Sequence, residues 1–145
     1  MPHLVILYTP NLETQTDMTA LCRRMADVML TVRDEQGTQV YPTGGTRVLA
    51  YPAKHFAIAD GGAAAKAAGG DGDYAFVYMN LRMGRGRSEA TKLRAGEVIS
   101  TAAKAHFSEL LQKTHMGLTV QVDEGQEAFD AKHSSLHPLF NKPKA

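Results

Sequence analysis

A strand–helix–strand pattern occurs twice along the chain, and it limits the possible folds more than any other feature of the sequence. In the first copy, residues 3–8 form an apolar, β-prone run. Apolar residues then recur at spacings of three and four over residues 18–32, which predicts an amphipathic helix with Thr16 or Asp17 as its N-cap. The β-rich residues 46–51 complete the copy. A helical crossover of this length predicts one βαβ unit with parallel strands.

The second copy begins after a glycine-rich segment. We expect a strand at residues 73–81, a helix with one apolar face from residue 88 to about 113, and a final strand at residues 118–122. Two such units can form one sheet with both helices on the same face. The predicted fold is therefore α/β, or α+β if the halves pair antiparallel, with duplicated βαβ units. Because the opposite face of the sheet stays open, we also expect an oligomer.

The rest of the chain predicts no second domain. With 145 residues and 43% hydrophobic content, residues 1–145 are expected to form one domain with an ordinary core. We interpret residues 55–59 as a further short strand. The Gly/Ala-rich residues 61–72 are interpreted as a flexible surface loop, since no large apolar side chain anchors them. The tail from Ser134 carries apolar residues outside any periodic element, and we expect it to pack on a neighbouring subunit or on its own chain.

Charge and cysteine content argue against several classes of partner. Lys and Arg number 16 and Asp and Glu 15, so no net field draws the chain to nucleic acid or to an anionic membrane. No apolar run reaches the length of a membrane span, and the apolar start of the chain is too short for a secretion signal. The single Cys22 cannot form an internal disulfide and fits a reducing compartment, so we expect a cytoplasmic protein.

Proline at position 2 is the main candidate for catalysis. Removal of Met1 would convert the Pro2 nitrogen from an amide to a secondary amine, which can act as a base. The proline ring and the strand that follows would hold this amine in place. Burial and nearby arginines would favour its neutral, basic form. The alternative interpretation of Pro2 is a terminal residue that opens an edge strand and does no chemistry.

We expect no metal and no cofactor. Gly84 and Gly86 lack the third glycine of a dinucleotide-binding loop, and no Gly-Lys-Ser/Thr follows them. The six histidines include no pair at helical ligand spacing with a carboxylate between. Cys22 lies on the apolar stripe of the first expected helix, where a buried and unreactive thiol is the default.

Several short motifs are more specific in combination than any of them alone. They are Pro2–His3, Ala59–Asp60–Gly61, residues 73–81, Gly84–Arg85–Gly86–Arg87–Ser88, Arg94–Ala95–Gly96–Glu97, His106–Phe107 and Leu136–His137–Pro138–Leu139–Phe140. Together they resemble the 5-carboxymethyl-2-hydroxymuconate isomerase family of the tautomerase superfamily. The resemblance spans most of the chain and is strongest over residues 73–111.

This resemblance implies an assembly, a reaction and a set of site residues. The assembly is a homotrimer of βαβ pairs whose sheets enclose a central space. The reaction is a cofactor-independent isomerisation of 5-carboxymethyl-2-hydroxymuconate. Pro2 takes a proton from the 2-hydroxy group and returns it to carbon, which gives the 2-oxo isomer. The pathway is the breakdown of 4-hydroxyphenylacetate through homoprotocatechuate. Arg47 and Arg87 match family arginines and are predicted to bind the carboxylates of this small substrate. Arg85 is a weaker candidate.

Other interpretations stay open at this point. Arg47 is otherwise a solvated arginine at a strand end, and Arg87 a neighbour of a helix N-terminus with no ligand. Residues 61–72 form a longer segment than the family leads us to expect, and residues 9–16 match it poorly. The alternative functions are a tautomerase for a different small enol or keto acid, and a non-catalytic oligomeric binding protein of the same fold.

Overall fold

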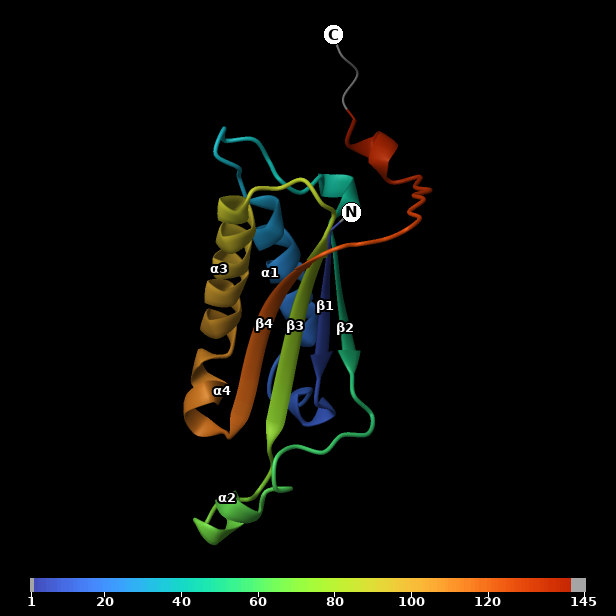
Figure 1. The fold of residues 1–145 in the computed structure, drawn as a ribbon. Coiled ribbons are helices and arrows are strands. Elements are labelled where there is room, and N and C mark those ends of the chain that lie inside the picture. Colours follow the sequence, from blue (N-terminus) through green and yellow to red (C-terminus); the bar gives the residue numbers. More distant parts are fainter. Residues whose placement is uncertain (1, 142–145) are drawn as a thin grey trace.

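Four strands form one mixed sheet in the computed structural model, which describes residues 2–141. The strands are β1 (His3–Tyr8), β2 (Arg47–Pro52), β3 (Ala75–Met83) and β4 (Met116–Glu124). Their order across the sheet is β2-β1-β3-β4. The pairs β1–β2 and β3–β4 are parallel, whereas the central pair β1–β3 is antiparallel (Figure 1). The two predicted βαβ units are confirmed, and their antiparallel junction makes the fold α+β.

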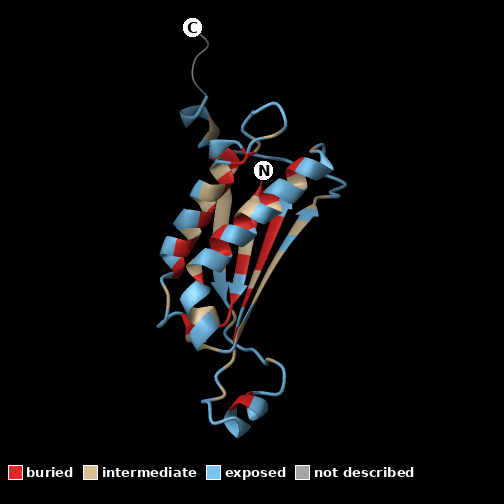
Figure 2. Ribbon diagram, turned by 90° about the vertical axis from the view of Figure 1, so that its left-hand side faces the viewer, coloured by how far each residue is buried: buried red, intermediate tan, exposed pale blue. Residues whose placement is uncertain are grey.

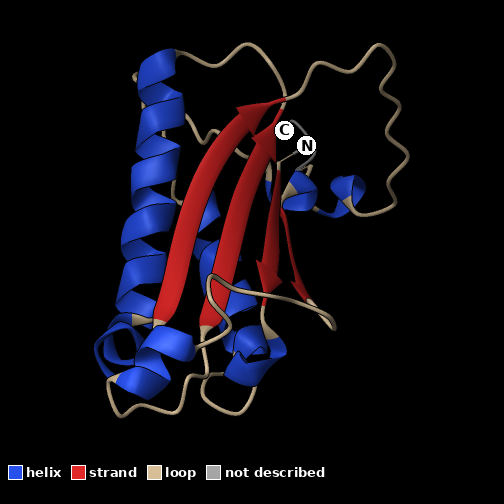
Figure 3. Ribbon diagram, turned by 60° about the horizontal axis from the view of Figure 1, so that its bottom comes forward, coloured by secondary structure: helices blue, strands red, loops and turns tan. Residues whose placement is uncertain are grey.

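Two long helices lie against one face of this sheet, behind the strands in Figure 3. Helix α1 (Met18–Leu30) connects β1 to β2, and α3 (Glu89–His106) leads from β3 toward β4. The side chains of Asp17 and Ser88 cap the two helices, because each accepts a hydrogen bond from a main-chain amide of the first turn. Both long helices therefore begin where the sequence predicts.

The second helix ends earlier than expected. Instead of running to Lys113 it stops at His106, and the short helix α4 (Ser108–Lys113) follows. Phe107 lies at the break, and its side chain is fully buried. No helix within residues 2–141 is long and apolar enough to cross a bilayer.

The hydrophobic core fills the space between the sheet and the helices, where the buried residues gather in Figure 2. Successive side chains of a strand point to opposite faces, so only alternate residues reach this core. On β1, Leu4 and Ile6 are fully buried, whereas Leu7 is 44% exposed. On β2, Leu49 is 46% exposed. Among the described residues no helix packs on that second face, which we call the open face.

Residues 53–72 differ from the expected pattern. The predicted strand at 55–59 is wrong, because the chain leaves the sheet after Pro52, which has no N–H for a further ladder bond. The Gly/Ala-rich segment contains a short helix, α2 (Ala63–Ala67), at the lower end of Figure 1. Asp60 organises its start, because its carboxylate accepts hydrogen bonds from the amides of Gly62 at 3.0 Å and Ala64 at 2.9 Å.

The C-terminal tail contacts its own chain near the start of β2. The 3₁₀ turn η3 (His137–Leu139) lies against the turn η2 (Thr43–Gly45). A Cβ added at Gly44 would lie 3.0 Å from Phe140 Cδ2, so this contact leaves little room for a larger residue there. Leu139 remains 74% exposed. The tail thus packs in part on its own chain, and packing on a neighbouring subunit stays a prediction.

Candidate active site

Pro2 and Arg47 lie side by side at one end of the sheet. Pro2 is buried and directly precedes β1, a central strand, and its carbonyl accepts a hydrogen bond from the Arg47 amide at 3.3 Å. Because β1 and β2 are parallel neighbours, the residues that begin them meet at the same end. The Arg47 guanidinium donates through Nη1 to the Gly45 carbonyl at 3.0 Å. The strand that Pro2 opens is therefore central and not at an edge, since β2 and β3 flank β1 on both sides.

Arg87 lies at the same end of the sheet, in the turn between β3 and α3. Since β3 is antiparallel to β1, its last residues reach the start of β1 (Figure 1). The guanidinium donates through Nη1 to the Gly84 carbonyl at 3.0 Å and through Nη2 to the Val40 carbonyl at 3.3 Å. A guanidinium carries five N–H groups, so these two bonds leave donors for a carboxylate. The half-buried Arg87 is thus held by the main chain from two separate segments.

Tyr41 supports Arg87 and was missed in the sequence. Its ring is fully buried and lies under the Arg87 guanidinium, 5.3 Å from Cζ to the ring centroid. Burial raises the pKa of Tyr41 to about 12, although Arg87 opposes this shift. The phenol therefore stays neutral near pH 7 and presents an aromatic face to the cation. No periodic pattern marks residues 33–46, so the sequence carries no signal for this role.

The two predicted arginines lie on different sides of the sheet end. Val48 and Ala50 pack against the core, so by strand alternation Arg47 points to the open face. Arg87 instead lies against Tyr41, which belongs to the core on the helix side. Pro2 and Arg47 are thus brought together within one chain, while Arg87 reaches the same end of the sheet from the opposite side.

Two further basic residues, His3 and Arg82, lie beside Pro2 on the open face. His3 is directly opposite Arg47 on β2 and opposite Arg82 on β3. Burial is the main cause that lowers the pKa of His3 from 6.5, and the charges of Arg47 and Arg82 lower it further, whereas Asp130 opposes them. His3 is therefore neutral near pH 7. Sequence reasoning missed this pair, because it depends on the register between strands far apart in the chain.

Arg85 is occupied elsewhere in the turn that precedes α3. It is exposed, and its Nε donates to the Gly125 carbonyl at 2.8 Å. This bond joins the turn to the segment that follows β4.

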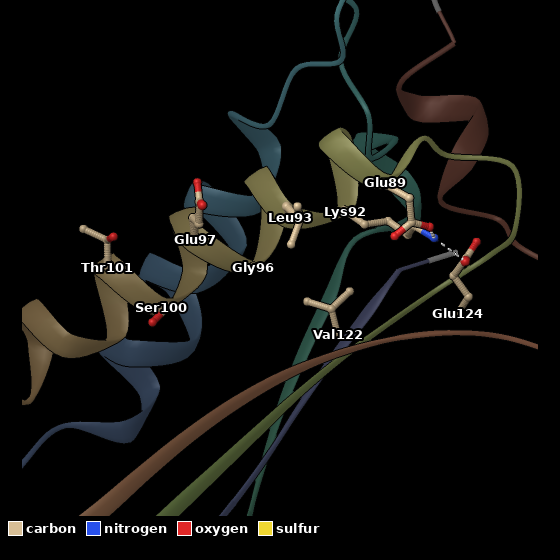
Figure 4. A pocket seen from close by; sticks show the side chains of 9 residues that line it. All are labelled: Glu89, Lys92, Leu93, Gly96, Glu97, Ser100, Thr101, Val122 and Glu124. Carbon is tan, nitrogen blue, oxygen red and sulfur yellow. Dashed lines mark hydrogen bonds and ion pairs between the residues drawn. The ribbon is translucent and has the colours of Figure 1, made fainter.

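A separate pocket of about 590 Å³ lies between α3 and β4 and contains none of the predicted site residues. Figure 4 shows Lys92 directed across this pocket toward Glu124, with an Nζ to Oε1 distance of 2.6 Å, and Lys92 also pairs with Glu89. Hydrogen bonds to Glu124 and then Glu89 raise the pKa of Lys92. Lys92 is thus held as a permanent cation, which makes it a poor base near neutral pH.

Metal-binding residue types do not cluster in the part of the chain that the structure describes. Residues 2–141 contain no group of three or more His, Cys, Asp or Glu side chains placed to hold one ion. Cys22 is half-buried, and burial raises the pKa of its thiol, which disfavours the reactive thiolate.

Comparisons with known proteins point to one family. Residues 2–140 match the family model described as 5-carboxymethyl-2-hydroxymuconate isomerase. The chain is 26% identical over 140 residues to the 5-carboxymethyl-2-hydroxymuconate Delta-isomerase of Escherichia coli, covering 97% of this chain and 99% of that protein. A crystal structure named 5-carboxymethyl-2-hydroxymuconate delta-isomerase has a TM-score of 0.95 and 62% identity, covering 100% of this chain and 96% of the other. The corresponding isomerase from Deinococcus radiodurans R1 has a TM-score of 0.79 and 28% identity, covering 97% and 95%.

Proposed function

Because the chain belongs to the 5-carboxymethyl-2-hydroxymuconate isomerase family, we propose that it isomerises 5-carboxymethyl-2-hydroxymuconate to its 2-oxo form in the breakdown of 4-hydroxyphenylacetate through homoprotocatechuate. The observation that carries the proposal is the position of Pro2, which is buried at the start of a central strand and accepts a main-chain hydrogen bond from the amide of Arg47. Removal of Met1 would place a secondary amine at that point. The proline ring and strand β1 would fix the direction in which this amine points.

Pro2 is the proposed acid and base. The amine takes the proton of the 2-hydroxy group, and the electrons of the broken O–H bond form the C2=O double bond while the conjugated double bonds shift along the chain. Pro2 then delivers the proton to C5, the far end of the conjugated system. Burial and the positive charge of Arg47 both disfavour an ammonium ion, which supports a neutral amine as the resting form.

Arg47 and Arg87 are the proposed carboxylate-binding residues. A planar guanidinium matches a carboxylate through two parallel N–H bonds. Negative charge spreads over the dienolate as the proton leaves, and fixed cations near it lower the barrier. Arg87 is suited to this role because Tyr41 and two carbonyls hold it before substrate arrives. Its place on the other side of the sheet end favours a site completed by a neighbouring subunit.

A homotrimer is the proposed assembly. The open face carries large apolar side chains that no helix of the described chain covers, namely Leu7, Leu49, Tyr51 and Phe76. Exposed apolar surface of this kind is typical of a subunit interface. We also propose a cytoplasmic location, because a chain with Cys22 as its single cysteine fits a reducing compartment.

The test compares wild-type protein, in which mass spectrometry verifies loss of Met1, with P2A and with protein that retains Met1. Spectrophotometric turnover of 5-carboxymethyl-2-hydroxymuconate should fall at least about 100-fold in both altered forms, which is the low end of general acid–base effects. P52A, which changes an exposed proline at the end of β2, is the matched control and should keep full activity. Undiminished turnover in both altered forms would contradict the role of Pro2. Equal wild-type rates with 2-hydroxymuconate, which lacks the carboxymethyl group, would favour a tautomerase of broader substrate range.

A further inference from the structure

Three basic residues form one row across the open face. Arg47, His3 and Arg82 come from three adjacent strands, and the register places His3 directly opposite both arginines. Because His3 is neutral near pH 7, the row carries two permanent charges, those of Arg47 and Arg82, on either side of an imidazole. Two guanidinium groups on one sheet face beside Pro2 can bind an anion.

Arg82 is the member of the row that its own chain leaves available. Within residues 2–141, no hydrogen bond or ion pair ties its exposed guanidinium. The carboxylate directly opposite Arg82 on β4 belongs to Asp123. Asp123 Oδ2 accepts a hydrogen bond from the buried side-chain amide of Asn80 at 2.8 Å. By contrast, main-chain carbonyls bind both Arg85 and Arg87 in the turn that follows.

The Arg82 side chain lines a pocket beside the start of the chain. This pocket of about 420 Å³ is bounded by His3, Arg82, Met83 and Gly84 on the sheet side. Gly84 is the residue whose carbonyl binds Arg87, so the pocket adjoins the predicted site. The segment after β4 closes the other side and brings Glu127, Asp130 and Lys132.

The acidic residues of this segment do not neutralise Arg82. Asp130 forms an ion pair with Lys132, and Glu127 makes no ion pair among the described residues. Arg82 thus supplies a positive charge on the sheet side of the pocket, and Glu127 lies on the other side. A small anion that enters would meet the Arg82 guanidinium there.

We propose that Arg82 binds the carboxymethyl group of the substrate and is the residue that distinguishes 5-carboxymethyl-2-hydroxymuconate from 2-hydroxymuconate. This inference rests on the proposed function. The substrate carries three carboxylates, two on the muconate chain and one on the carboxymethyl arm, whereas Arg47 and Arg87 account for two. The carboxymethyl arm is attached to C5, the carbon that receives the proton from Pro2. A group on that carbon must lie close to Pro2, and Arg82 lies across β1 from Arg47 in the row next to Pro2.

The experiment measures kcat and KM of wild type, R82Q and R82K with 5-carboxymethyl-2-hydroxymuconate and with 2-hydroxymuconate. R82Q should raise KM for the tricarboxylate about 10- to 100-fold, the range for loss of one charge-assisted bond, and should change kcat/KM for the dicarboxylate less than about threefold. R82K should lose less, because it keeps the charge without the two-pronged geometry. R24Q removes an exposed arginine of α1 and is the matched control for net charge, with no change for either substrate.

The remaining outcomes separate the two proposals. If wild type is active and R82Q is either unchanged on both substrates or impaired equally on both, the role of Arg82 is overturned. The proposed function then stays intact. Wild type inactive on both substrates would overturn the proposed function and this inference with it. Thermal unfolding supplies an independent check on the fold, since replacement of an exposed side chain with no hydrogen bond or ion pair within residues 2–141 should leave the Tm of R82Q close to that of wild type.

Discussion

The guanidinium of Arg87 lies over the ring of Tyr41, with 5.3 Å between Cζ and the ring centroid. The two residues come from separate connections, one after α1 and one after β3, and Arg87 also binds the Val40 carbonyl. A cation over a desolvated aromatic face gains on the order of 1–2 kcal/mol. The buried ring therefore sets both the position of Arg87 and the packing of the connection that carries Tyr41.

Replacement of Tyr41 by leucine should affect stability and substrate binding together. Loss of the buried ring in Y41L is expected to reduce the free energy of unfolding by about 2–4 kcal/mol, as for other large-to-small core changes. KM should rise more than kcat falls, because Arg87 loses its support. Urea unfolding and steady-state kinetics measure the two effects. Y41F keeps the ring and is the control, and a Y41L enzyme with normal KM and reduced kcat would show that Tyr41 does not position a binding residue.

Acid should weaken the fold through His3. Its pKa is lowered from 6.5 in the folded chain, mainly by burial and then by Arg47 and Arg82, so the unfolded chain binds a proton more readily. The free energy of unfolding should consequently fall as the pH drops below about 6.5, and the loss should level off below the folded pKa. Denaturant unfolding between pH 7.5 and 5 should show a shallower decline in H3Q. H133Q, in the exposed tail, is the control, and equal slopes for wild type and H3Q would refute the contribution of His3.

Glycine at position 62 should be essential for the local structure around α2. Its φ is +98°, and an added Cβ would lie 2.1 Å from the Gly72 carbonyl oxygen. Gly61 has a φ of +70° but nothing within 4 Å of an added Cβ, so G61A is a close control that carries the backbone cost alone. Trypsin cleavage after Lys66 in α2 should be much faster in G62A than in G61A. Equal cleavage rates would mean that the contact with Gly72 does not hold this segment.

A charge on the open face should prevent assembly. Leu49 lies on β2 with 46% of its surface exposed, and L49D would place a carboxylate in the proposed interface. We expect sedimentation analysis to show monomers for L49D and trimers for wild type, because burial of an unpaired charge is strongly unfavourable. L93D alters a residue of α3 that is 66% exposed on the helix side and should leave the trimer intact. A trimer of L49D would exclude this part of the open face from the interface.

Much of the fold follows from local patterns. The alternation in β1 and the three- and four-residue spacing in α1 each reflect how one element buries one face, and the structure has both elements where these patterns predict them. The capping residues Asp17 and Ser88 were predictable for the same reason, since a cap acts within its own first turn. The helix α2 was not, because Asp60 outside the Gly/Ala-rich run organises it.

The candidate site likewise contains some residues that the sequence predicts and others that only the tertiary structure brings together. The sequence alone supplied Pro2, Arg47 and Arg87 as candidates, because Pro2 and Arg87 lie in short family motifs and Arg47 matches a family arginine. Only the tertiary structure brought His3 opposite Arg82 and placed Tyr41 beneath Arg87. These pairs join residues 79 and 46 positions apart, and strand register and core packing bring them together, neither of which any local sequence pattern encodes.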